Sequence, residues 1–263
     1  MVTISLDDIW FRYQGAEDYI LESFNWYFDG MRSIGLLGSN GSGKTTLLKI
    51  LAGLLTPERG CMKINNKEVK GVKTTKKMVS YVPENAKLFL VGPTPRADLL
   101  RILKDKSTVD EIITEFKIDK LADSKLYHLS EGQRRVIAII NAFHLSRDLF
   151  LLDEPTIGLD APSRSLLLEL TEKAVQEGKL VILSTNDPRL FPRLDQLLVL
   201  NNNKICLQGS PVEVLFQLEK ETGLLPNQIV RLIQSLEQET GKRLPRFTTA
   251  GEINRALQKG RGL

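Results

Sequence analysis

Hydrophobic positions near the N-terminus alternate with polar ones, and this pattern predicts β-strands that bury one face. Apolar residues stand at every second position over residues 2–6, a period that places them on one side of a strand. Turn-forming pairs at Gln14-Gly15 and Asp29-Gly30 divide the segment that follows. We therefore expect residues 2–37 to form antiparallel strands.

Further along the chain the pattern changes to short, almost continuous apolar runs. Such runs are typical of parallel strands that are buried on both faces. They occupy residues 79–82, 149–152, 180–183 and 197–200, and segments with helical spacing separate most of them. Alternating strands and helices predict a parallel sheet with helices on both faces, so we expect an α/β fold.

Two stretches have helical spacing without intervening strands. Residues 96–128 carry apolar positions at helical intervals among many charges, which predicts a helical insertion. The chain from Pro211 onward has the same character. We therefore divide the protein into a main domain over residues 1–210, with a helical subdomain over about residues 86–145, and a C-terminal helical extension over residues 211–263.

A glycine-rich motif follows the apolar stretch at residues 33–37 and precedes a helical pattern that continues to about Leu55. Its glycines let the backbone turn tightly and direct N–H groups toward an anion, and the helix N-terminus adds a positive dipole end. Lys44 can reach the β- and γ-phosphates of a nucleotide, and the Thr45 hydroxyl can bind Mg²⁺. The residues of this predicted phosphate loop are Gly38, Ser39, Asn40, Gly41, Ser42, Gly43, Lys44, Thr45 and Thr46.

A second motif completes a phosphate-loop NTPase site. The apolar run at residues 149–152 continues into Asp153 and Glu154. Ligands of open parallel sheets bind at the carboxyl ends of the strands, where these two side chains are expected to lie. We expect Asp153 to hold Mg²⁺ through water, and Glu154 to orient or deprotonate the attacking water.

The nucleotide is predicted to be ATP. Guanine-specific proteins of this class carry an Asn-Lys-x-Asp reader, and the nearest string, at residues 66–69, lacks the aspartate. This difference favours ATP or loose base selection through stacking. Tyr13 follows the first strand pattern, where it is either a stacking partner for adenine or a core or edge aromatic residue.

Composition agrees with an ordinary globular protein and argues against several classes. Hydrophobic residues make up 42% and charged residues 26% of the 263 residues. No apolar run is long enough to span a bilayer, and the N-terminus lacks the features of a secretion signal. Cys61 and Cys206 have no metal-ligand spacing, which favours reduced thiols in the cytosol. The net charge of +4 does not by itself indicate nucleic acid, and we expect no nucleic-acid partner.

The segment between the two nucleotide motifs resembles the signature sequence of ATP-binding cassette (ABC) ATPases. It reads Leu-Ser-Glu-Gly-Gln-Arg-Arg over residues 129–135, directly before a helical pattern. Ser130 is a favourable N-cap, and Gly132 permits close approach of the backbone. Residues 158–160 resemble the D-loop of the same family, and the resemblance covers residues 1 to about 210.

The resemblance implies a dimer with two shared ATP sites. Each ATP would lie between the phosphate loop of one subunit and the signature helix of the other. Tyr13 would stack on adenine, and Lys44, Glu154 and Asn186 would take part in hydrolysis. The residues that would contact the ATP held by the second subunit are Ser130, Gly132, Gln133 and Asp160.

Three positions depart from the family's pattern. Glu84 replaces the Q-loop glutamine; it can still offer an oxygen to Mg²⁺, but it adds negative charge near the triphosphate. Asn186 replaces the switch histidine and carries no charge at pH 7, which weakens its hydrogen bond to a γ-phosphate oxygen. Glu131 replaces a glycine of the signature, a milder change. Because Glu84 and Asn186 belong to the same half-site, we favour a heterodimer over a homodimer.

The C-terminal extension resembles the tail of energy-coupling factor ATPases, which power the uptake of vitamins and transition metals. Ile229, Leu232, Ile233 and Leu236 form an apolar stripe at helical spacing. In that group the tail helps to hold two ATPase subunits together. The other interpretation is a helix that packs on its own domain.

The predicted function is therefore ATP binding and hydrolysis by a subunit of an ABC importer of the energy-coupling factor type. The expected partners are a second ABC ATPase subunit and a membrane transport subunit that carries a vitamin or a metal ion. The protein would be cytoplasmic and peripheral on the inner face of the cell membrane. The alternative is a weakly catalytic, ATP-binding half of a heterodimer in which the partner cassette performs most of the hydrolysis.

Overall fold

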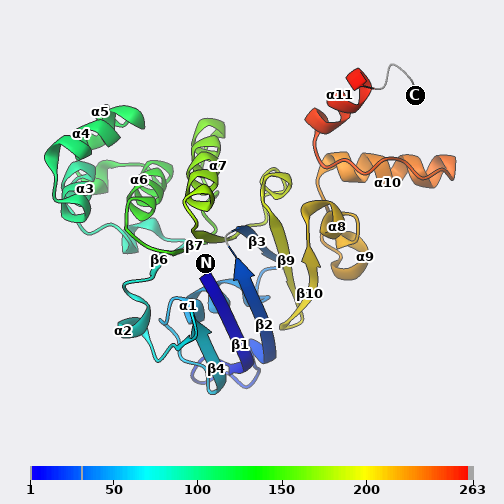
Figure 1. The fold of residues 1–263 in the computed structure, drawn as a ribbon, viewed down its shortest axis with the longest axis horizontal. Coiled ribbons are helices and arrows are strands. Elements are labelled where there is room, and N and C mark those ends of the chain that lie inside the picture. The colour runs from blue at the N-terminus through cyan, green and yellow to red at the C-terminus, as the bar shows by residue number, and fades with distance from the viewer. Residues whose placement is uncertain (1, 31, 260–263) are drawn as a thin grey trace.

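The computed structural model describes residues 2–30 and 32–259, which form two sheets with helices around them (Figure 1). The first sheet is antiparallel, with the strand order β2-β1-β4-β5. Its strands are β1 (Val2–Phe11), β2 (Leu21–Gly30), β4 (Arg59–Ile64) and β5 (Lys67–Glu68). The predicted alternation in β1 is confirmed, because Val2, Ile4 and Leu6 are buried. The period shifts after Leu6, where an irregular register reverses the alternation before Ile9.

The second sheet is mainly parallel and has the strand order β10-β9-β3-β8-β7-β6. Its strands are β3 (Ser33–Gly38), β6 (Val79–Val82), β7 (Leu149–Asp153), β8 (Leu180–Ser184), β9 (Gln196–Asn201) and β10 (Lys204–Gly209). Only the edge strand β10 runs antiparallel to its neighbour in this sheet. The expectation that residues 33–37 join the antiparallel sheet is wrong, because β3 pairs in parallel with β8 and β9. All six residues of β3 are buried, as a central parallel strand requires.

Both faces of the parallel sheet are covered. The longer helices next to it are α1 (Lys44–Leu51), α6 (Glu131–Phe143) and α7 (Ala161–Gln176), and shorter elements are α2 (Val72–Thr75) and the 3-10 turn η3 (Phe191–Arg193). One face packs on α1 and on the antiparallel sheet, and the other packs on α6 and α7. Helix α1 ends earlier than the predicted Leu55, because Gly53 adopts a left-handed conformation (φ 72°) that stops the helix.

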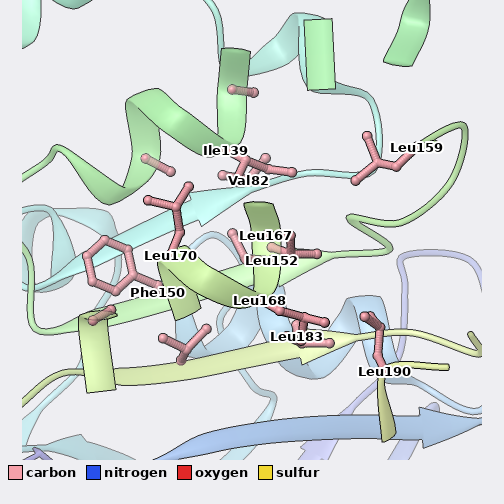
Figure 2. Close-up of a cluster of buried hydrophobic side chains, with 14 of the residues drawn as sticks. Val82, Ile139, Phe150, Leu152, Leu159, Leu167, Leu168, Leu170, Leu183 and Leu190 are labelled. Atoms are coloured by element: carbon pink, nitrogen blue, oxygen red, sulfur yellow. The ribbon is translucent and has the colours of Figure 1, made fainter. Parts of the chain in front are cut away.

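A dense core joins α6 and α7 to the parallel sheet (Figure 2). Val82, Phe150, Leu152 and Leu183 come from the strands, Ile139 comes from α6, and Leu167, Leu168 and Leu170 come from α7. Each of these side chains is at most 6% exposed. This packing holds the carboxyl ends of β3, β7 and β8 at one edge of the sheet, which is where Gly38, Asp153 and Ser184 lie.

The predicted helical insertion is confirmed and lies beside α6 (Figure 1). Its elements are η1 (Ala86–Leu88), α3 (Pro95–Leu103), α4 (Lys106–Glu115), α5 (Asp119–Ala122) and η2 (Leu126–His128). Thr94 caps the N-terminus of α3 and Asp105 that of α4, because each of these side chains accepts a hydrogen bond from a backbone N–H of the first turn.

The C-terminal extension contains α8 (Pro211–Leu215), α9 (Leu218–Thr222), α10 (Gln228–Thr240) and α11 (Ala250–Lys259). Residues 260–263 of the predicted extension lie outside the described residues. Val214, Leu215, Leu218 and Val230 are buried in the same core as α6 and α7, so the first helices of the extension are part of the main domain's packing. Helices α10 and α11 project from the β10 side of the molecule (Figure 1). Among the described residues, no helix is long and apolar enough to cross a membrane.

The apolar stripe predicted on α10 divides into two parts. Ile233 is buried at 5% exposure, and Ile229 is partly buried. Leu232 and Leu236 are instead 53% and 39% exposed. One side of α10 therefore packs on the protein's own domain, and a second apolar row faces outward.

Candidate nucleotide-binding site

The predicted phosphate loop connects β3 to the N-terminus of α1. Two of its glycines are required by geometry. A Cβ at Gly38 would lie 2.3 Å from the Ser42 Oγ and 2.6 Å from the Leu200 carbonyl oxygen. Gly43 is the N-cap of α1 and has a left-handed conformation (φ 98°) that other residues rarely adopt. Among the residues that the structure describes, no side chain caps this helix, so its first N–H groups remain available to an anion.

Lys44 lies over the loop and is only 7% exposed. Its Nζ donates hydrogen bonds to the carbonyl oxygens of Gly38 at 2.7 Å and Ser39 at 3.2 Å. Burial lowers the pKa of Lys44, and the nearby carboxylates of Glu154 and Asp153 oppose this effect. The two hydrogen bonds hold the Lys44 amino group over the loop.

Asp153, at the end of β7, accepts hydrogen bonds from three hydroxyl groups. Thr45 Oγ1 lies 3.0 Å and Ser184 Oγ lies 2.7 Å from the Asp153 Oδ1 atom. Tyr81 Oη donates to the Asp153 Oδ2 atom at 3.2 Å, and burial together with this carboxylate raises the pKa of Tyr81. The network fixes Asp153 beside Thr45, the pair that the sequence predicted as ligands of Mg²⁺.

The oxygen atoms at this position fit Mg²⁺ by their chemistry. Mg²⁺ prefers hydroxyl, carboxylate and phosphate oxygens, and it usually takes one or two carboxylates from the protein. Thr45 and Asp153 supply such atoms, and Glu84 lies on the wall of the same cavity as Thr45. Within residues 2–30 and 32–259, no three His, Cys, Asp or Glu side chains form a group suited to a metal ion.

Glu154 has an unusual backbone conformation, with φ at 45°. Its N–H donates to Ser184 Oγ at 2.9 Å, and its carbonyl oxygen accepts a hydrogen bond from the Arg135 Nη1 atom at 2.9 Å. Burial raises the pKa of the Glu154 carboxyl, while Lys44 lowers it and Asp153 and Glu84 raise it further. A carboxylate with a raised pKa is better suited to accept a proton than an exposed one.

A cavity of about 570 Å³ brings most of the predicted residues together. Its lining comes from five separate parts of the chain, which confirms that these segments meet in space. The residues are Tyr13, Ile20, Asn40, Gly41, Ser42, Gly43, Lys44, Thr45, Thr46, Glu84, Glu154, Ile157 and Asn186. Two of the three departures from the family pattern, Glu84 and Asn186, therefore lie on the same cavity as the phosphate loop.

Tyr13 lies at the rim of this cavity and is 40% exposed. Its Oη atom is 3.2 Å from the Thr46 Oγ1 atom, and its ring packs edge-on against Phe11. A buried core position for Tyr13 is wrong, because this residue is 40% exposed, whereas an edge aromatic residue agrees with this exposure. Stacking on adenine stays a prediction.

The signature residues lie on a different cavity, of about 720 Å³. Ser130, Gly132, Gln133 and Asp160 all line it. Ser130 and Gln133 form a reciprocal capping box at the start of α6, with bonds of 3.2 and 2.9 Å. A Cβ at Gly132 would lie 2.6 Å from the Gly158 carbonyl oxygen, so the signature and the D-loop pack as closely as a glycine allows. The two predicted half-sites are thus separate on one chain.

Three residues around Asp153 and Glu154 were not found from the sequence. They are Tyr81, Ser184 and Arg135. The parallel register of β7 and β8 places Ser184 opposite Asp153. The contact could therefore have been predicted from the sequence if the pairing of these two strands had been known. No local pattern distinguishes Arg135, because its partners are backbone carbonyls distant in sequence.

The fold and this site define a phosphate-loop nucleoside triphosphatase. The sequence profile of the family described as "ABC transporter" matches residues 21–157. This chain belongs to the ABC transporter family and is an ATPase of that family. The resemblance seen in the signature segment is thereby confirmed.

The curated relatives extend over almost the whole chain. The energy-coupling factor transporter ATP-binding protein EcfA of Methanocaldococcus jannaschii is 28% identical and covers 98% of this chain and 97% of its own length. The cobalt import ATP-binding protein CbiO of Salmonella typhi is 29% identical, with 97% of each chain covered. A putative ABC transporter ATP-binding protein of Methanopyrus kandleri is 33% identical over 78% of this chain and 81% of its own.

Solved structures support the fold. An ATP-binding cassette determined as a dimer in a post-hydrolysis state, bound to ADP and Pi, superposes with a TM-score of 0.70. It is 21% identical and covers 79% of this chain and 98% of its own. An ATP-binding subunit of an ABC transporter gives a TM-score of 0.71 at 24% identity, over 89% of this chain and 98% of its own.

Proposed function

We propose that this chain is the ATP-hydrolysing subunit of an ABC importer of the energy-coupling factor type, which takes up a vitamin or a metal ion through a membrane partner. The observation that carries the proposal is the alignment with EcfA and CbiO, which includes the C-terminal extension and not only the ATPase core. The similarity to these proteins therefore extends into the part of this chain that contains α8 to α11.

In this proposal the phosphate loop binds the triphosphate of ATP. The free N–H groups of α1 and the fixed ammonium of Lys44 contact the phosphate oxygens, and Tyr13 stacks on the adenine. Thr45 and Glu84, with Asp153 acting through water, would hold Mg²⁺, which neutralises phosphate charge when bound. All these groups border one cavity or contact a residue that does.

Hydrolysis would depend on Glu154 and Asn186, which face the same cavity. Glu154 orients the attacking water and accepts its proton, and the raised pKa of this carboxyl suits that role. Asn186 donates a neutral hydrogen bond to an oxygen of the γ-phosphoryl group. Because charge builds on this group during transfer, a neutral donor stabilises the transition state less than a cationic one.

The separation of the two half-sites supports a dimer. Ser130, Gly132, Gln133 and Asp160 line a cavity that shares no residue with the phosphate-loop cavity, so they would contact ATP held by a second cassette. The departures Glu84 and Asn186 affect only the site on this chain's own loop. We therefore propose a heterodimer in which the site that uses the partner's phosphate loop hydrolyses ATP faster.

A docking face for the membrane subunit lies on the helical subdomain. Leu88, Val91 and Tyr127 are 76%, 70% and 69% exposed, which is unusual for large apolar side chains. The Leu126 N–H donates to the Pro93 carbonyl, which brings the segment of Tyr127 against the segment of Val91. Contact through this face would place the protein peripherally on the inner side of the membrane.

Hydrolysis by the assembled protein tests this function. The chain should hydrolyse ATP slowly alone and faster when it is purified together with a second cassette and a membrane subunit. ATP-driven uptake into vesicles that contain this complex is the direct measurement. Uptake that proceeds equally well without this chain would contradict the proposal.

Replacing Asn186 by histidine should raise hydrolysis at this chain's own site by at least about threefold, because a cationic donor stabilises the developing phosphoryl charge. The measurement is single-turnover hydrolysis in a mixed dimer whose partner lacks its phosphate-loop lysine. Asn186→Gln is the matched control, since it keeps a neutral donor. A rate that stays the same or falls would show that Asn186 is not a weakened switch residue.

Replacing Leu232 and Leu236 together by aspartate should prevent dimerisation in the absence of nucleotide. Both side chains are exposed on α10, whereas Val230 and Ile233 hold the helix on its own domain, so the fold should be retained. Two unpaired carboxylates in an interface cost several kcal/mol.

Light scattering of the protein with its partner cassette measures this effect. The control adds two charges at other exposed positions of α10, Ser235→Asp and Gln238→Asp. If the dimer persists in the leucine variant but is lost in the control variant, the contact lies on the side of α10 that carries Ser235 and Gln238. Survival of both would remove α10 from the interface.

A further inference from the structure

Arg135 is a buried guanidinium group whose hydrogen-bond acceptors lie outside its own helix. It belongs to α6, directly after the signature residues, and is only 3% exposed. Its Nη1 atom donates to the carbonyl oxygens of Glu154 at 2.9 Å and Ile157 at 2.8 Å. Its Nη2 atom donates to the carbonyl oxygen of Glu84 at 2.5 Å. A buried charge of this kind is retained only where its hydrogen bonds are satisfied.

The three acceptors belong to two segments that are distant in the sequence. Glu84 follows β6, and Glu154 to Ile157 follow β7. Both segments carry an acidic side chain on the wall of the phosphate-loop cavity. A guanidinium presents its donors in one rigid plane, so it fixes the distance between the two segments. A lysine ammonium offers its donors from one nitrogen and without a fixed plane, so it would hold the two segments less rigidly.

The backbone of Glu154 explains why such a contact is needed. A non-glycine residue at a φ of 45° is in a sparsely populated conformation, which persists only when its surroundings determine it. Ser184 holds the Glu154 N–H, and Arg135 holds the Glu154 carbonyl oxygen. Together these contacts fix the peptide groups on both sides of Glu154, and thereby the direction of its side chain.

The same guanidinium is also connected to the signature surface. Glu131 Oε1 lies 3.5 Å from the Arg135 Nη2 atom, and Glu131 Oε2 lies 3.1 Å from the Arg134 Nη2 atom. The Glu131 side chain is 48% exposed, next to the residues that would face ATP on a second cassette. Arg135 therefore contacts the segments of Glu84 and Glu154 and also Glu131, the sequence neighbour of the signature residues Ser130 and Gly132.

We propose that Arg135 is a positioning residue that fixes Glu84 and Glu154 relative to one another and ties both to the signature helix. It acts through hydrogen bonds to the backbone carbonyl oxygens of these two residues. This inference rests on the roles proposed above for Glu84 and Glu154. The contacts themselves do not depend on those roles, so the two can be tested separately.

Hydrogen exchange of the purified chain tests the contacts without any partner or catalysis. In Arg135→Gln, amides of residues 84–88 and 154–158 should both exchange at least about tenfold faster, since each segment loses a donor that orders it. Arg134→Gln is the matched control. Arg134 pairs with the same Glu131 and donates to the carbonyl oxygens of Leu126 and Leu129, but it contacts neither segment.

Arg135→Lys guards against a variant that fails to fold. Its one nitrogen should hold the two segments less rigidly than the guanidinium does, so exchange should rise in at least one of them. Unchanged exchange in both segments, in either folded variant, would overturn the proposal. Faster exchange spread evenly along α6 and the core would also overturn it, because that result describes a purely structural arginine.

Kinetics in the assembled dimer then separate positioning from binding. Turnover should fall by about tenfold in Arg135→Gln, while the Kd for ATP changes by less than about twofold. An equal loss of ATP affinity would contradict the positioning role. If exchange rises as expected but Glu154→Gln leaves turnover unchanged, Arg135 joins the segments as described and the proposed role of Glu154 is the part that fails.

Discussion

Replacing Glu154 by glutamine is expected to lower ATP turnover at this chain's site by at least about tenfold, within the range that removal of a general base produces. The glutamine amide has the same shape but cannot accept a proton from water. ATP binding should remain intact, since the phosphate loop, Lys44 and Thr45 are unchanged. The backbone contacts of Glu154 with Ser184 and Arg135 do not involve its carboxylate, so the local structure should also be retained.

The measurement is single-turnover hydrolysis in a dimer whose second site is inactive, with the Kd for ATP measured in parallel. Glu172→Gln is the matched control, because this glutamate is exposed and pairs with Arg193. Burial raises the pKa of Glu154, so wild-type turnover should fall as the pH drops through a value above that of an ordinary glutamate. The variant should lack this dependence. Unchanged turnover would assign the hydrolysis to the partner's site and leave Glu154 without the proposed role.

Replacing Lys44 by alanine is expected to weaken ATP binding by about tenfold to a hundredfold, which corresponds to the loss of charge-assisted hydrogen bonds to phosphate. Lys44 is buried over the loop, so its positive charge acts on the phosphates with little screening by water. Removal of this side chain leaves the backbone N–H groups of the loop in place. Residual binding through those groups is therefore expected.

Isothermal titration of the purified chain with ATP measures the effect directly and needs no hydrolysis. Lys49→Ala is the matched control, because Lys49 lies on the same helix and does not line the cavity. A variant that unfolds would be detected by its lower Tm without ATP. A folded Lys44→Ala that binds ATP as tightly as the wild type would show that this lysine does not contact the phosphates.

Much of the site followed from local sequence because its chemistry depends on short motifs. The phosphate loop needs glycines at Gly38 and Gly43 for close contact and a left-handed turn, and these leave a pattern that can be read without a structure. The run that ends in Asp153 and Glu154 predicted the second half of the site for the same reason. Tyr13 was ambiguous, because an aromatic residue after a strand has no local feature that separates a core position from an exposed rim.

The fold was predicted wherever periodicity alone determines structure. The parallel strands were predicted from continuous apolar runs, because these strands are buried on both faces. The helical insertion and the C-terminal helices were predicted from apolar positions at helical spacing. The assignment of residues 33–37 to the antiparallel sheet was wrong, because an apolar run indicates a buried strand but not the sheet to which the strand belongs. The stripe on α10 divided because helical spacing does not distinguish a row that packs inward, at Ile233, from one that faces outward, at Leu232.

The sequence by itself determined the class of chemistry: a phosphate loop, two acidic residues after a strand, a signature segment and three departures from the family pattern. The tertiary structure decided which of these meet. It placed Glu84 and Asn186 on the cavity of the phosphate loop, and the signature residues on another cavity. It also revealed Arg135 and Ser184 as the residues that fix Glu154. Both residues form hydrogen bonds with the backbone of Glu154. Because nearly every residue carries the same backbone N–H and C=O groups, the sequence does not indicate which of them will be a partner. The partners are selected only when the chain folds.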